Sequence, residues 1–193
     1  MPMHLAVRHQ LPGFMSHSPP PPPYAIDLES TVDEATVALA TQPESVVTWR
    51  PSPTAWCAKE IIGHLIDSAT NNHQRFVRAA RQPDLVFPGY AQDEWVSVQA
   101  YARAPWNELL SLWRSYNRHL AWVMAAIPPE IRSRRHARHN LHEIGWSTVA
   151  ADVPATLNDL MADYVGHLRH HIGQVHDRVR AARAAASLLP ASR

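Results

Sequence analysis

Apolar residues recur at intervals of three and four along four long stretches of the chain, the pattern of helices that bury one face. The expected helices span about residues 28–40, 52–81, 105–127 and 152–186. Ser52, Thr54 and Asp152 are candidate N-caps, and Pro105 and Pro154 suit first turns. No alternating strand pattern of useful length appears, so the sequence predicts an all-α fold.

Two long connections separate these helices, and a four-helix bundle with long crossover loops is therefore expected. The first connection, residues 84–104, carries Tyr90, Trp95 and Tyr101, and we expect it to pack over an end of the domain. The second, residues 130–149, begins with a basic run from Arg132 to His139, which we expect to be solvated.

The two ends of the chain differ from its centre in composition. Five consecutive prolines, residues 19–23, favour polyproline II and cannot enter a helix interior. We therefore divide the 193 residues into a proline-rich leader (1–24), a four-helix domain (25–186) and a flexible tail (187–193).

Composition narrows the range of partners and compartments. The formal net charge of +1 indicates neither a nucleic-acid-binding nor a membrane-binding protein. Cys57 is the only cysteine, which excludes an intramolecular disulfide and a cysteine-rich zinc module. Its apolar context favours a buried, unreactive thiol. With no expected signal peptide or membrane span, we expect a cytoplasmic protein that acts on a small molecule.

Three of the thirteen histidines interrupt apolar helix faces. His167 and His171 are four residues apart and project from one face of the fourth helix. His64 lies beside Ile61 and Leu65 in the second helix. The pair alone fits core histidines satisfied by carboxylates or backbone about as well as it fits a metal site. All three together favour a metal centre, because bundle interiors bind metals through side chains of facing helices.

Neighbouring residues supply further candidates. His170 is three residues from His167 and competes with His171, but the four-residue spacing is better aligned, so we expect His170 at an edge or in a hydrogen bond. Asp67 is one turn past His64, and Asp163 is one turn before His167. Each could orient a ligand or carry a proton, or be a solvated or N–H-bonded carboxylate.

The chain resembles the DinB/YfiT-like superfamily of four-helix-bundle metalloproteins over residues 28–179. The resemblance rests on Trp56 with Lys59–Ser68, Pro88–Tyr90 with Asp93–Trp95, Glu108 and Trp113, and Thr156–Leu157 with Asp163–Gln174. It implies an up-down-down-up bundle, a divalent metal held by His64, His167 and His171, and frequent dimer formation. It also implies metal-dependent hydrolysis or, in related branches, thiol-dependent transfer.

Three functions stay open at this point. The first is a metal-dependent hydrolase in which the ion activates water, the second is a metal-dependent thiol S-transferase, and the third is a non-catalytic metal-binding or stress-response module. Zinc or nickel is the preferred ion, with iron, cobalt and manganese as alternatives. We expect a homodimer with neither nucleic acid nor membrane as a partner.

Overall fold

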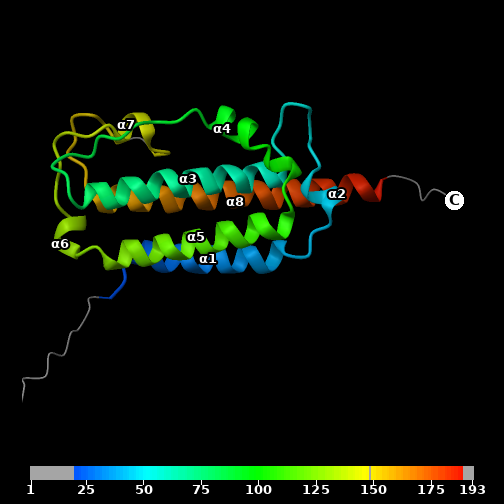
Figure 1. Cartoon of the computed structure of the whole chain (residues 1–193), viewed down its shortest axis with the longest axis horizontal. Coiled ribbons are helices and arrows are strands. Elements are labelled where there is room, and N and C mark those ends of the chain that lie inside the picture. The colour runs from blue at the N-terminus through cyan, green and yellow to red at the C-terminus, as the bar shows by residue number, and fades with distance from the viewer. Residues whose placement is uncertain (1–19, 148, 189–193) are drawn as a thin grey trace, which may run out of the picture.

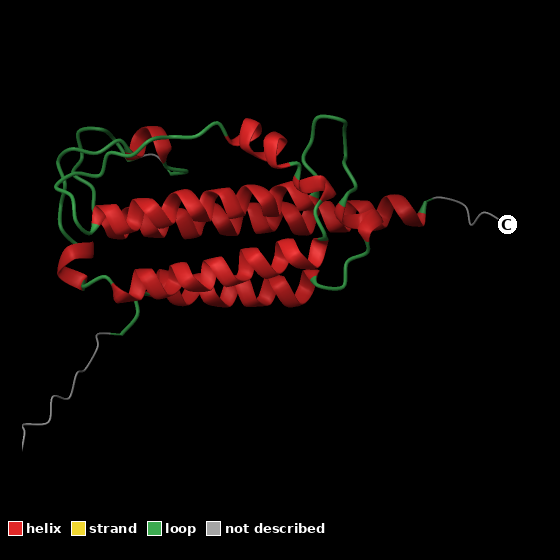
Figure 2. Cartoon of the chain, in the orientation of Figure 1, coloured by secondary structure: helices red, strands yellow, loops and turns green. Residues whose placement is uncertain are grey.

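Four long helices form the body of the protein (Figure 1), whose computed structural model describes residues 20–147 and 149–188. They are α1 (Pro23–Leu39), α3 (Ala58–Ala79), α5 (Trp106–Ala126) and α8 (Leu157–Ser187). The shorter elements are α2 (Glu44–Val47), α4 (Gln92–Gln99), the 3-10 turn η1 (Tyr101–Arg103), α6 (Pro129–Arg132) and α7 (Leu141–Ile144). Among the described residues no strand occurs, only two isolated β-bridges (Figure 2), and the predicted all-α bundle is confirmed.

The four long helices run up, down, down and up, as Figure 1 shows. Helices α3 and α5 are parallel, so the chain must return along the bundle between them. The 22 residues of α3 span about 33 Å at 1.5 Å per residue. The first crossover makes this return alongside α3 and includes α4 and η1. Our expectation that it covers an end of the domain is therefore wrong.

Helix α3 begins at Ala58, later than its candidate caps Ser52 and Thr54. The Glu60 carboxylate accepts a hydrogen bond from the backbone N–H of Cys57 (2.9 Å), which caps the helix. Arg50 forms an ion pair with Glu60 and donates to the carbonyl of Ala55, which holds the preceding turn outside the helix. Cys57 itself is fully buried, as its apolar context predicts.

Helix α8 likewise begins later than expected, at Leu157. Thr156 is the N-cap, and its hydroxyl accepts from the backbone N–H of Asp159 while the Asp159 carboxylate accepts from that of Thr156. Ala155 is held in a bridge to His136 through two backbone hydrogen bonds. Because this bridge keeps residue 155 extended, Asp152 and Pro154 cannot start the helix.

The basic run in the second crossover is only partly solvated, which corrects our prediction. Arg132, His136 and His139 are buried, whereas Arg134, Arg135 and Arg138 are exposed. His136 contacts the carbonyl of Pro83 through Nδ1 (2.9 Å), and His139 contacts that of Val153 through Nε2 (2.8 Å). The two buried histidines therefore join loop segments to each other.

The helical region begins two residues before the predicted domain start at residue 25 and ends one residue after its predicted end at residue 186. Helix α1 begins at Pro23, and a proline is well suited to a first turn because its missing N–H would have no helical partner. The expected leader and tail lie largely in residues 1–19 and 189–193, outside the described residues. Within the described part of the chain, no helix is both long and apolar enough to cross a membrane.

Candidate metal centre

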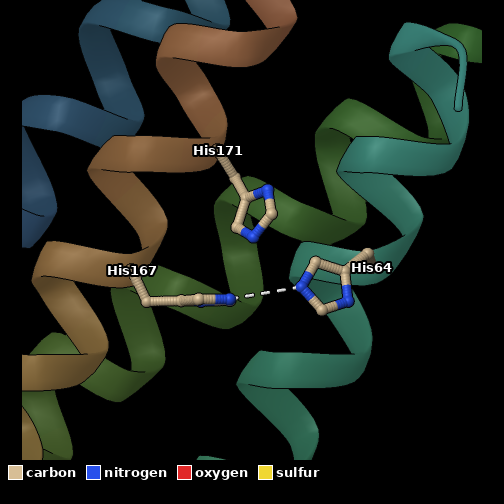
Figure 3. A group of neighbouring side chains, drawn as sticks. All are labelled: His64, His167 and His171. Carbon is tan, nitrogen blue, oxygen red and sulfur yellow. Dashed lines mark hydrogen bonds between the residues drawn. The ribbon is translucent and has the colours of Figure 1, made fainter. Parts of the chain in front are cut away.

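The three predicted histidines meet between α3 and α8 (Figure 3). The Nε2 atoms of His64 and His167 are 3.2 Å apart. The ring of His171 lies 4.7 Å from that of His64 and 4.4 Å from that of His167, between centroids. One ring nitrogen from each of the three lies within 4.8 Å of the others. The tertiary structure therefore assembles the group from two antiparallel helices.

The donor set fits a divalent transition metal ion. Two imidazole nitrogens bound tetrahedrally at about 2.0–2.1 Å would lie about 3.3 Å apart, close to the observed separation. The side-chain oxygen of Gln174 lies 2.8 Å from Nδ1 of His171, so that Nδ1 donates and Nε2 keeps its lone pair. The hydroxyl of Ser68 lies 3.5 Å from Nδ1 of His167. Such contacts orient ligand rings in metal sites.

Burial keeps the three imidazoles neutral, the form that binds metal. It lowers the pKa of His64 from 6.5 to about 4, with repulsion from His171 as a smaller cause. It lowers the pKa of His167 to about 3, aided by repulsion from His171 and His64. The pKa of His171 is also lowered, mainly by burial, although the bond to Gln174 opposes this. Protons therefore compete weakly with a metal at neutral pH.

The stability of the metal-free protein should depend on these pKa shifts. In the unfolded chain each imidazole takes up a proton near pH 6.5, but in the folded protein His64 does so only near pH 4 and His167 near pH 3. The unfolded state then binds more protons, so stability is full above pH 6.5 and falls as the pH drops toward the folded values. The loss should be on the order of 1 kcal/mol or more per histidine.

Urea unfolding in EDTA at pH 7, 6 and 5 measures this loss. The double variant His64→Gln/His167→Gln should lose less stability between pH 7 and 5 than the parent protein. Equal losses in the two proteins would show that the two histidines titrate normally in the fold.

The histidines face a pocket with a volume of about 390 Å³. Its walls come from α3, from α8 and from both crossovers, so the candidate metal centre opens onto this pocket. The lining residues are His64, Ser68, Asn72, Arg75, Gly89, Tyr90, Gln92, Glu143, Ile144, Gly145, Trp146, Leu160, Asp163, Tyr164, His167, His170 and His171.

Asp67 lies beside the site without touching the histidines. Its Oδ1 accepts hydrogen bonds from the hydroxyl of Tyr101 and the amide of Gln99, both at 2.7 Å. Its Oδ2 is buried and has no partner in the described part of the chain. Burial raises the pKa of Asp67 despite these two bonds. The structure thus gives Asp67 a clear contact with the first crossover, and its role in proton transfer stays a prediction.

Asp163 lines the pocket and holds its rim. Its two carboxylate oxygens accept from the backbone N–H groups of Trp146 (2.9 Å) and Ser147 (2.6 Å). It thereby fixes the segment after α7 against α8. The structure thus gives Asp163 a positioning role, and its role in proton transfer stays a prediction.

Of the other aromatic and histidine residues named in the sequence analysis, some lie at the pocket and others lie in the core. Tyr90 lines the pocket, and burial raises its pKa to about 12. Trp95 packs on Tyr90, with ring centroids 5.1 Å apart. Trp113 is fully buried and does not line the pocket. His170 is exposed and contacts the amide of Gln174 (3.1 Å), as expected for an edge residue.

Three α3 residues that line the pocket were not predicted from the sequence to belong to the site. Ser68, Asn72 and Arg75 follow His64 at steps of four, four and three residues, so all four lie on one helix face. That periodicity was available in the sequence. The burial of Arg75 was not, because it depends on the first crossover.

The fold and the histidine group together place the protein among four-helix bundles that have a candidate metal site between two helices. A family model of the DinB superfamily matches residues 27–175, and the chain therefore belongs to the DinB superfamily. Among solved structures it is similar to YfiT from Bacillus subtilis, a probable metal-dependent hydrolase with an unusual four-helix bundle topology. The TM-score is 0.67 at 18% identity, covering 82% of this chain and 85% of YfiT. No curated protein matches the sequence.

Proposed function

We propose that His64, His167 and His171 bind one divalent transition metal ion and that the protein is a metal-dependent hydrolase of small molecules. The observation that carries this proposal is the convergence of three neutral imidazoles on an accessible pocket. Neutral rings with low pKa values suit metal binding, and an accessible side leaves room for water and a substrate. The description of YfiT as a probable metal-dependent hydrolase supports the same class of function.

Within this proposal, the ion would act as a Lewis acid and lower the pKa of a water molecule toward neutrality. The chain's own residues hold and orient the ligands. Gln174 fixes the ring of His171, and Asp163 keeps the Trp146 segment at the pocket wall. Zinc or nickel is the preferred ion, since imidazole ligands suit both. Dimer formation stays a prediction, which light scattering would test.

Elemental analysis followed by turnover assays tests the function. We expect about one metal ion per chain, and metal-dependent hydrolysis of at least one ester, amide or lactone in water alone. His64→Ala should abolish the turnover. The matched control is His73→Ala on the same helix, because His73 bonds to Tyr116 and does not line the pocket.

The other two functions predict different results in the same assays. Turnover that requires an added thiol and an electrophile would replace the hydrolase by the S-transferase. Bound metal without turnover across the whole panel would favour the non-catalytic module. Protein that binds no transition metal ion under any loading condition would contradict the proposal entirely.

A further inference from the structure

A buried arginine lines the pocket at a distance from the histidines. Arg75 has only 6% of its surface exposed. Its Nη2 donates to the backbone carbonyl of Pro88 (3.0 Å), and its Nη1 lies 3.5 Å from the amide oxygen of Asn72. Both partners are neutral, and the second bond is long. A guanidinium has five N–H donors and keeps its charge at neutral pH, and within the described residues only two of these donors have a protein partner.

No carboxylate neutralises this charge within ion-pair distance in residues 20–147 or 149–188. Asp163 is the acidic residue of the pocket whose field reaches Arg75. Its two oxygens accept hydrogen bonds from the backbone N–H groups of Trp146 and Ser147, and it forms no ion pair with Arg75. A buried charge without a charged partner is costly, and a ligand of opposite charge would supply the missing partner.

We propose that Arg75 binds an oxyanion, a carboxylate or phosphate group, carried by the substrate. The planar guanidinium group can form two parallel hydrogen bonds to either anion. Such a bidentate contact fixes the orientation of the anion and adds affinity. This anion site depends on the proposed hydrolase function only in that the reacting bond is placed at the metal. The binding of the anion itself needs no metal.

The spacing along α3 limits the shape of this substrate. Arg75 follows His64 by eleven residues, which places their Cα atoms about 16 Å apart at 1.5 Å per residue. Side chains of a helix lean toward its N-terminus, so the guanidinium lies nearer to the histidines than its Cα does. The substrate should therefore carry its anionic group apart from the bond that reacts.

Binding of simple anions to the metal-free protein tests this assignment. Hexanoate and inorganic phosphate are titrated in EDTA, and the side-chain Nε–Hε resonance of Arg75 is followed by NMR. We expect a saturable shift with at least one of them, and none with the neutral hexanamide. Binding should weaken about 10- to 100-fold in Arg75→Gln, the loss of one charge-assisted pair. The stronger anion identifies the group.

Matched variants separate charge from structure. Arg78→Gln removes the same charge one turn further along α3, where Arg78 is exposed, and it should leave binding unchanged. Arg75→Lys keeps the charge without the fork and should recover only part of the affinity. Because Arg75 also holds the Pro88 carbonyl, thermal melts check the fold of each variant. Should Arg75→Gln fail to fold, the resonance of the parent protein still reports binding directly.

The two proposals fail in different ways. An Arg75 resonance that neither anion moves, or equal affinities in the parent and in a folded Arg75→Gln variant, would overturn the anion site. Anion binding that appears only after zinc is added, and that is unaffected by Arg75→Gln, would place the anion on the metal and overturn it as well. Neither result would touch the hydrolase assays. Conversely, anion binding at Arg75 in a protein that takes up no metal would leave this inference intact.

Discussion

Replacing His64 by alanine should lower the affinity for zinc or nickel by at least about 100-fold. Even partners that only orient metal ligands contribute about 10- to 100-fold to affinity, so a lost ligand should cost no less. His64 is the one proposed ligand on α3, and its Nε2 lies 3.2 Å from that of His167. Without it, His167 and His171 form a pair on one helix, which cannot complete a three-histidine site.

Metal content after dialysis and competition with a chromogenic chelator measure this loss. His73→Ala on α3 and His176→Ala on α8 are the controls, because each removes one imidazole from the same helix without touching the pocket. Both controls should keep the parent affinity. A His64→Ala protein that retains its metal would show that the ion binds elsewhere.

Replacing Gly63 by alanine should destabilise the fold by about 1–3 kcal/mol, the usual cost of overpacking a core. A Cβ at this position would lie 2.0 Å from Cδ2 of Tyr101, far inside van der Waals contact. The ring is held there by the bond from its hydroxyl to Asp67 (2.7 Å). To relieve the clash, η1 must move away from α3, and this bond must lengthen or break.

Gly173 provides the matched substitution, because it also lies inside a long helix but has nothing within 4 Å of the added Cβ. Gly173→Ala should therefore show only the helix-propensity gain of about 0.5–1 kcal/mol. Urea unfolding of both variants compares the two effects. If Gly63→Ala is as stable as Gly173→Ala, the close packing of Tyr101 on α3 does not contribute to stability.

Helix periodicity predicted the four long helices but not where α1, α3 and α8 begin. Ser52 and Asp152 are chemically good caps, as is Thr156 with Asp159, whereas at Cys57 the cap is supplied by the Glu60 carboxylate. The choice between them is made by contacts outside the helices. Arg50 holds the turn before α3, and the bridge from Ala155 to His136 holds the chain extended before α8.

The candidate site, too, was only partly predictable from the sequence. The three histidines were predictable, because four-residue spacing places His167 and His171 on one face and the apolar neighbours of His64 turn it toward the core. The contacts of Asp67 and Asp163 were not, because their partners Tyr101 and Trp146 come from the two crossovers. Loop positions follow no periodicity that a sequence displays.

By itself, the sequence determined the helical class of this protein, the faces that its helices bury and the three histidines proposed to bind a metal. These depend on spacing within one helix, which the 3.6-residue turn sets locally. Only the tertiary structure decided that His64 meets His167 across two helices and that Arg75 is buried against Pro88. Both depend on how the crossovers return the chain along the bundle, and that path is set by packing between residues far apart in sequence.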